Sequence, residues 1–147
     1  MATLPSASAR RKITPVHALP RPAAPPPRPR LSITQIVNDA GAISHEEVGR
    51  ILNMSKAQLA ETVGLSAQVF QKASRRDGPK AQSRMREMVE IIALVQDWAG
   101  SPAQAMAWYR AEPIPAFGGR TAEALVKSGA AGAVRDYIDH LATGGYA

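Results

Sequence analysis

The stretch that decides the fold is KAQLAETVGLSAQVFQK, residues 56–72. Its first half places Leu59 and Val63 on one face of a helix, because residues four apart are neighbours on a helix surface. Gly64 follows, and glycine readily adopts the left-handed conformation that a tight interhelical turn demands. Ser66 is then a typical cap for a second helix. The stretch therefore predicts two helices that cross at a glycine turn.

Signals for helix starts recur outward from this pair. A serine followed three residues later by Glu or Gln, the capping-box pattern, begins three helices near residues 44–53, 55–63 and 101–110. Between the last two, apolar residues at three- and four-residue spacing predict a long amphipathic helix over residues 81–98. The same pattern predicts a final helix over residues 130–142. The buried stripe expected on the long helix consists of Met85, Met88, Val89, Ile92, Val95 and Trp98.

No stretch alternates convincingly between apolar and polar residues as a half-buried strand would. Residues 31–38 remain ambiguous, because their β-branched side chains do not favour a helix even though their spacing permits a short one. We therefore predict an all-α fold.

The first 30 residues differ in composition from the rest of the chain. They contain eight of the 12 prolines and six basic residues, but no acidic residue. Because proline lacks an amide donor and fixes φ, we expect residues 1–30 to form a disordered Pro/Arg-rich tail. Such a tail is a solvated linker, a non-specific phosphate tether or a Pro-rich ligand for another protein. A transit peptide is a weaker option, because the proline content opposes the amphipathic helix that such peptides need. We divide the remainder into a helix-turn-helix region, residues 31–80, and a second helical unit, residues 81–147.

The helix pair around Gly64 resembles the Xre/Cro-like helix-turn-helix family, and this resemblance implies that the second helix reads DNA. We expect Val69, Phe70 and Ala73 to face inward. Gln can pair with adenine and Arg or Lys with guanine, whereas Arg76, Lys80 and also Arg84 would contact phosphates. The DNA-binding residues expected are Gln68, Gln71, Lys72, Arg75, Arg76 and Lys80.

The distribution of charge supports a nucleic-acid partner for this region. The net charge of +6 belongs entirely to the tail, but residues 66–86 carry a local net charge of +5. The alternative is a helical hairpin with a solvated basic face, which is common in all-α proteins. From residue 87 onward the net charge is −3, and the change of sign suggests a second, different partner.

The second specific signal is AWYRAEPIPAFGGRTAEALV, residues 107–126. The prolines at 113 and 115 end a helix, the two glycines permit an unusual turn, and Thr121 can cap the next helix. Without further information, an ordinary loop or an anion-binding nest would also fit. The arrangement resembles the toxin-binding domain of the Xre/MbcA/ParS antitoxins over residues 85–147.

The resemblance implies a RES-domain toxin, an enzyme that acts on NAD, whose active-site entrance the antitoxin covers. It also implies repression of the antitoxin's own operon through operator DNA. The antitoxin would be a homodimer within a larger hetero-oligomer. The toxin-binding residues implied are Trp108, Pro113, Phe117, Gly118, Gly119, Arg120, Gly145, Tyr146 and Ala147.

No catalytic constellation is visible in the sequence. The chain has no cysteine, and its three histidines, His17, His45 and His140, lack metal-ligand spacing. We therefore expect neither an enzyme nor a cofactor nor a metal. No apolar run approaches the length needed to cross a membrane, so we expect a cytoplasmic protein.

Two other functions compete with the antitoxin. The first is a free-standing phage-repressor-like transcriptional regulator, in which the C-terminal helices serve only for dimerisation. The second is an adaptor whose Pro-rich tail recruits partners and whose helical unit binds no DNA. A RES-domain reading frame beside this gene would favour the antitoxin.

Overall fold

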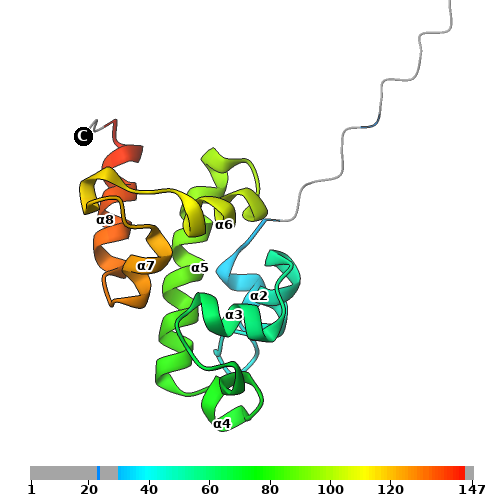
Figure 1. Cartoon of the computed structure of the whole chain (residues 1–147). Coiled ribbons are helices and arrows are strands. Elements are labelled where there is room, and N and C mark those ends of the chain that lie inside the picture. Colours follow the sequence, from blue (N-terminus) through cyan, green and yellow to red (C-terminus); the bar gives the residue numbers. More distant parts are fainter. Residues whose placement is uncertain (1–22, 24–29, 145–147) are drawn as a thin grey trace, which may run out of the picture.

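The computed structural model describes residue 23 and residues 30–144, and every regular element in these residues is helical (Figure 1). In this part of the chain, the only backbone pairing of the β type consists of two isolated bridges. The all-α prediction is therefore confirmed. The tail expected over residues 1–30 falls almost entirely outside the described residues.

Eight α-helices and two short 3-10 helices make up the described part of the chain. In chain order they are α1 (Ile33–Ile36), α2 (His45–Leu52), α3 (Lys56–Thr62), η1 (Ala67–Phe70), α4 (Ala73–Arg76), α5 (Pro79–Ala99), α6 (Pro102–Ala111), η2 (Pro115–Phe117), α7 (Ala122–Lys127) and α8 (Ala131–Ala142).

Serine and threonine caps begin the helices where the sequence placed them. At α3, the Ser55 hydroxyl accepts from the Gln58 amide and the Gln58 side chain accepts from the Ser55 amide, which completes a capping box. Ser44 and Ser101 cap α2 and α6 through the hydroxyl alone, so their boxes are only half formed. Thr121 caps α7 as expected.

The second helix of the predicted pair is interrupted. Residues 67–76 form η1 and then α4, separated by Lys72 in an extended conformation, and Ser66 makes no capping hydrogen bond. Phe70 is the only residue of this segment that is buried, and Ala73, expected to face inward, is exposed. Because short helices depend on packing of an apolar face, one buried side chain is too little to hold a continuous helix against the core.

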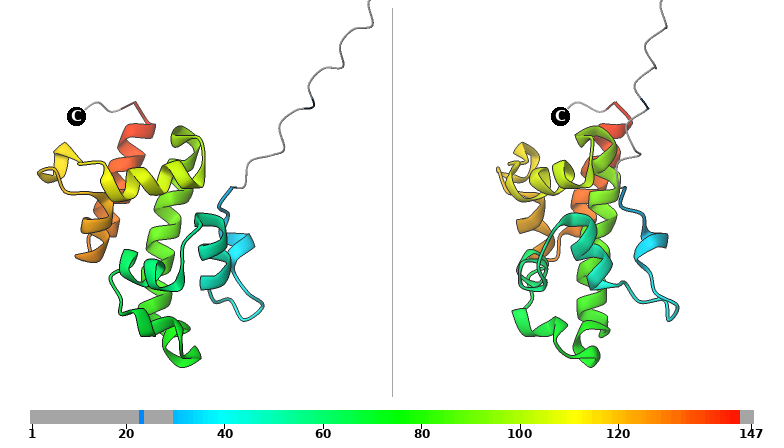
Figure 2. Two further views of the ribbon diagram at one scale, coloured as in Figure 1. Left: turned by 45° about the vertical axis from the view of Figure 1, so that its right-hand side comes forward. Right: turned by 90° about the vertical axis from the view of Figure 1, so that its right-hand side faces the viewer.

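Helix α5 runs through the centre of the molecule (Figures 1 and 2). Helices α6, α7 and α8 pack against it, while α2 and α3 pack against each other and α2 contacts α6. Most of the buried residues of α5 belong to one apolar cluster that extends from the N-terminal helices to α8. The predicted division between the helix-turn-helix region, which ends at residue 80, and the second helical unit lies within the first turn of α5.

Two glutamines of α5 hydrogen-bond to the N-terminal segment. Each side-chain amide pairs with both the backbone amide and the backbone carbonyl of one residue. The Gln96 side chain accepts from the Leu31 amide and donates to the Leu31 carbonyl, both at 2.9 Å. The Gln82 side chain makes the same pair of bonds with Ile43, at 2.7 and 3.2 Å.

Of the ambiguous residues 31–38, only Ile33–Ile36 form a helix.

The expected stripe on α5 is buried except at one end. Met85, Met88, Val89, Ile92 and Val95 are buried, but Trp98 is 48% exposed, so its placement in the core was wrong. Trp98 lies in the last turn of α5, where it packs against Trp108 of α6 instead of the core.

None of the described helices is long and apolar enough to span a membrane.

A glycine-to-alanine substitution should have opposite effects on stability at two helical positions. A Cβ at Gly49 would lie 2.8 Å from the Met54 carbonyl oxygen, whereas a Cβ at Gly132 meets nothing within 4 Å. Gly49→Ala should therefore destabilise the fold by about 1 to 3 kcal/mol through overpacking. Gly132→Ala should stabilise it by about 0.5 to 1 kcal/mol through helix propensity. Urea unfolding of both variants checks this, and equal shifts would contradict the tight contact at Gly49.

Candidate functional site

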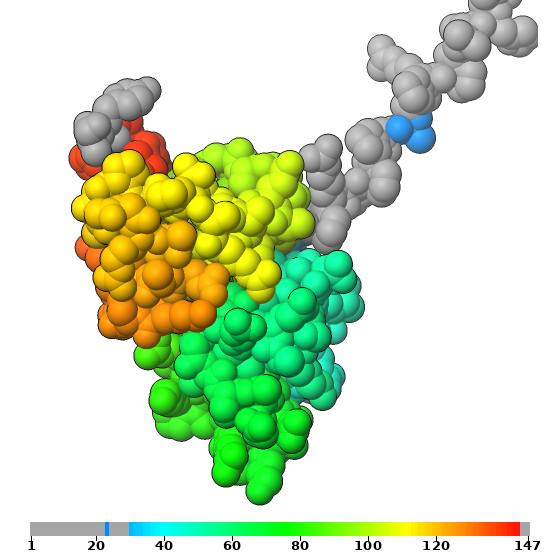
Figure 3. Space-filling view, viewed as in Figure 1, coloured from blue at the N-terminus to red at the C-terminus, as the bar shows by residue number. Residues whose placement is uncertain are grey.

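The residues expected to bind DNA gather at one tip of the molecule. Residues 67–80, around the α4 label of Figure 1, form this tip at the lower end of Figure 3. Arg76 is half-buried and lies 3.8 Å from the Asp77 carboxylate, from Nε to Oδ1. The exposed members of the predicted set are Gln68 in η1, Gln71 and Lys72 in the link, Arg75 in α4 and Lys80 in α5.

An aromatic stack anchors this tip to α2. The ring of Phe70 lies parallel to the imidazole of His45, with ring centroids 5.1 Å apart. His45 is buried, and its Nε2 atom has no hydrogen-bond partner among the described residues. Burial lowers the pKa of His45, and the positive charge of Lys56 acts in the same direction. The neutral imidazole thus acts as an apolar support for the basic segment.

Gln82, which the sequence did not single out, fixes the other end of the segment. Besides its bonds to Ile43, its side-chain amide donates to the Arg76 carbonyl at 2.9 Å. Arg84, expected near phosphates, is engaged within the fold. Its guanidinium donates to the carbonyls of Val126 and Lys127, at 2.6 and 3.1 Å, at the end of α7. Both bonds come from Nη1 of the guanidinium, and the phosphate contact expected of Arg84 stays a prediction.

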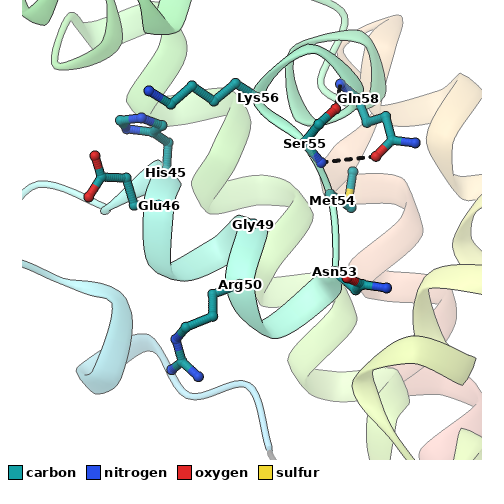
Figure 4. A pocket seen from close by; sticks show the side chains of 9 residues that line it. All are labelled: His45, Glu46, Gly49, Arg50, Asn53, Met54, Ser55, Lys56 and Gln58. Atoms are coloured by element: carbon teal, nitrogen blue, oxygen red, sulfur yellow. Dashed lines mark hydrogen bonds between the residues drawn. The ribbon is translucent and has the colours of Figure 1, made fainter.

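A surface hollow of about 660 Å³ lies between α2 and α3 (Figure 4). The backbone and side-chain groups of Ser55 and Gln58 that face each other there are already used in the capping box. The remaining charged groups are of both signs, so no single charge dominates the hollow. Its lining consists of His45, Glu46, Gly49, Arg50, Asn53, Met54, Ser55, Lys56 and Gln58.

The loop between α6 and α7 is closed on itself. The Ile114 amide donates to the Arg120 carbonyl at 3.0 Å, and the Gly119 amide donates to the Ile114 carbonyl at 3.0 Å. Gly118 and Gly119 have φ values of +66° and +82°, a region that other residues rarely adopt. The glycine pair thus allows a 3-10 turn to be folded between two bridged residues, and the sequence PIPAFGGR forms a defined surface feature.

The comparison with protein families decides what this region is. Residues 94–144 match the family model described as the antitoxin Xre/MbcA/ParS C-terminal toxin-binding domain. This region belongs to the Xre/MbcA/ParS antitoxin family. Neither the comparison with curated proteins nor that with solved structures gave a match. The chain therefore carries an antitoxin domain, and a toxin is the partner of that domain.

The matched domain begins within α5 and contains six of the residues expected to contact the toxin. Phe117 is half-buried and packs edge-on against Tyr137 of α8, with ring centroids 5.9 Å apart. Pro113, Gly118 and Gly119 are exposed, and Trp108 is half-buried. Three further expected residues, Gly145, Tyr146 and Ala147, lie outside the described residues.

Arg120 connects the loop at residues 113–120 to α7 and the residue that follows it by hydrogen bonds. Its guanidinium donates to the Ser128 hydroxyl at 3.0 Å and to the Ala124 carbonyl at 3.3 Å, while the side chain stays exposed. The match does not cover the predicted helix-turn-helix, so DNA binding stays a prediction from the sequence. Among the described residues, no group of His, Asp or Glu side chains is arranged to hold a metal ion.

Proposed function

We propose that this chain is the antitoxin of a type II toxin–antitoxin pair, that it neutralises a RES-domain toxin, and that it represses its own operon. The observation that carries the proposal is the match of residues 94–144 to the antitoxin toxin-binding domain. The RES-domain identity of the toxin and the homodimer within a larger complex come from the family resemblance. The antitoxin acts by binding, without chemistry of its own.

The block on the toxin is steric in this proposal. The closed loop at residues 113–120 and the end of α8 lie at the same end of the molecule (Figures 1 and 2). A loop fixed by its own hydrogen bonds loses little conformational entropy when it docks, which favours affinity. We place this end against the entrance of the toxin's active site, where bound antitoxin would exclude the NAD substrate.

The neutralisation step predicts a specific effect of shortening the chain. Deleting residues 144–147 should leave thermal unfolding and DNA binding unchanged but reduce the survival of cells that express the RES-domain toxin. The reason is that Tyr146 would supply a large contact area with few rotatable bonds. Co-expression survival and pull-down with the product of the adjacent gene measure this. Full protection by the shortened chain would contradict a role for the terminus.

DNA binding by the tip is supported by its charge and exposure. Gln68, Gln71, Lys72 and Arg75 project from the segment that replaces the expected second helix, and charge is locally +5 over residues 66–86. Gln and Arg suit base edges in the major groove, and Lys suits phosphates. We propose that the interrupted segment contacts the operator, with Phe70 and His45 holding it on the core.

Arg75 and Lys80 should differ in what they contribute to operator binding. Arg75→Ala should weaken binding to operator DNA by about 1 to 3 kcal/mol, with little effect on random DNA, because a base contact carries sequence information. Lys80→Ala is the control: it should weaken both kinds of DNA equally and reduce the salt dependence. Titrations at two salt concentrations measure this. If Arg75→Ala lost the same affinity for operator DNA and for random DNA, Arg75 would contact the DNA backbone and not a base.

The alternative is a free-standing repressor-like regulator whose C-terminal helices only dimerise. The same pull-down separates the two, because that regulator would bind operator DNA and itself but would not retain the RES-domain protein.

A further inference from the structure

Two large apolar side chains on one face of α5 are exposed to solvent. Leu94 and Trp98 are 40% and 48% exposed, and the other large apolar side chains in the described residues are half-buried or buried. The two lie four residues apart and are therefore neighbours on the helix surface. The two side chains form a small exposed apolar patch, and exposed apolar patches are found at interaction sites.

The exposed Trp98 ring is held in place before any partner arrives. It packs edge-to-face against Trp108 of α6, with ring centroids 6.4 Å apart and planes at 79°. Trp108 in turn packs against the apolar core. An aromatic ring that is already oriented loses little rotamer entropy on binding, and tryptophan is enriched among the residues that dominate interface affinity.

The patch is continuous with the proposed toxin interface. The matched toxin-binding domain starts at Leu94 itself. Helix α6, which carries Trp108, leads directly into the loop at residues 113–120. Three segments lie at the upper end of the molecule in the views of Figures 1 and 2: the end of α5, this loop and the end of α8.

We propose that Leu94 and Trp98 anchor the protein toxin, so that its interface extends from the loop onto α5. This inference rests on the proposed function. The partner that fits is a toxin face with an apolar pocket for the indole ring, because both residues belong to the matched toxin-binding domain and Trp98 packs against Trp108, one of the residues expected to contact the toxin. A second copy of this chain is the competing occupant, and the test below separates it from the toxin.

The test uses the full-length protein and, as the probe, the purified product of the adjacent gene, which we expect to be the RES-domain toxin. Trp98→Ala should raise the Kd for this toxin at least about tenfold, and Leu94→Lys should do so as well by placing a cation in the apolar contact. Ile33→Ala, a half-buried apolar residue of α1 outside the matched domain, is the control and should leave the Kd unchanged. Operator binding and circular dichroism of each variant verify the fold. Leu94 is exposed and is not a member of the core cluster, so Leu94→Lys serves if Trp98→Ala unfolds.

The outcomes separate this inference from the proposed function. An unchanged Kd for both α5 variants, with a parent protein that binds the toxin, overturns the anchor alone. Loss of self-association with retained toxin affinity also overturns it and assigns the patch to a second copy. Failure of the parent antitoxin to bind the RES-domain protein overturns the proposed function and the anchor together.

Discussion

Replacing Gln96 with alanine should lower the free energy of unfolding by about 2 to 5 kcal/mol, because two buried backbone groups lose their partners at about 1 to 3 kcal/mol each. The groups are the amide and the carbonyl of Leu31, which is buried and bonded on both atoms by the Gln96 side chain. Urea unfolding followed by circular dichroism measures the loss.

Gln104 offers a matched control for this substitution. It lies exposed in the first turn of α6, and its side chain makes no hydrogen bond within the described residues. Gln104→Ala should change stability by no more than about 0.5 kcal/mol, as is usual for surface positions. Equal effects at the two positions would mean that water replaces the Gln96 amide at Leu31 without cost.

Tyr109→Ala should destabilise the fold by about 3 to 5 kcal/mol, since removal of a large buried aromatic side chain leaves a cavity. Tyr109 is fully buried and is among the largest side chains in the core. Thermal and urea unfolding would both show the loss.

Tyr109→Phe should have almost no effect on stability. The Tyr109 hydroxyl is buried without a hydrogen-bond partner among the described residues, and burial together with the nearby Glu123 and Glu87 carboxylates raises its pKa. Removing it sacrifices no hydrogen bond, so we expect a change within about 1 kcal/mol, in either direction. A loss above about 2 kcal/mol would show that the hydroxyl is bonded to a buried water.

The sequence predicts the helices well where the deciding interactions are local. Ser55 and Gln58 lie within one turn, so the capping box and the start of α3 can be read directly. The glycine turn is of the same kind, because φ of +75° at Gly64 is a property of one residue. The interruption at Lys72 could not be read in this way. It depends on how little of the segment reaches the core, which only the packing around Phe70 determines.

The same distinction applies to the candidate sites. The composition of the basic tip indicates which side chains are polar, but the bonds of Arg84 to α7 join residues 42 and 43 positions apart and leave no local signal. Trp98 fits the apolar spacing of α5 as well as Val95 does. Periodicity assigns a residue to a face and cannot show where the neighbouring helices cease to cover that face, so the exposed tryptophan was missed.

The continuity of α5 sets a thermodynamic condition on the two proposed partners. This helix spans about 32 Å at 1.5 Å per residue, and it leads from the basic tip at Lys80 to the exposed ring of Trp98. In the proposed function, operator and toxin would therefore contact opposite ends of one helix. Any coupling through α5 must be reciprocal: a toxin that tightens operator binding by a given factor is itself held more tightly on the operator by that factor.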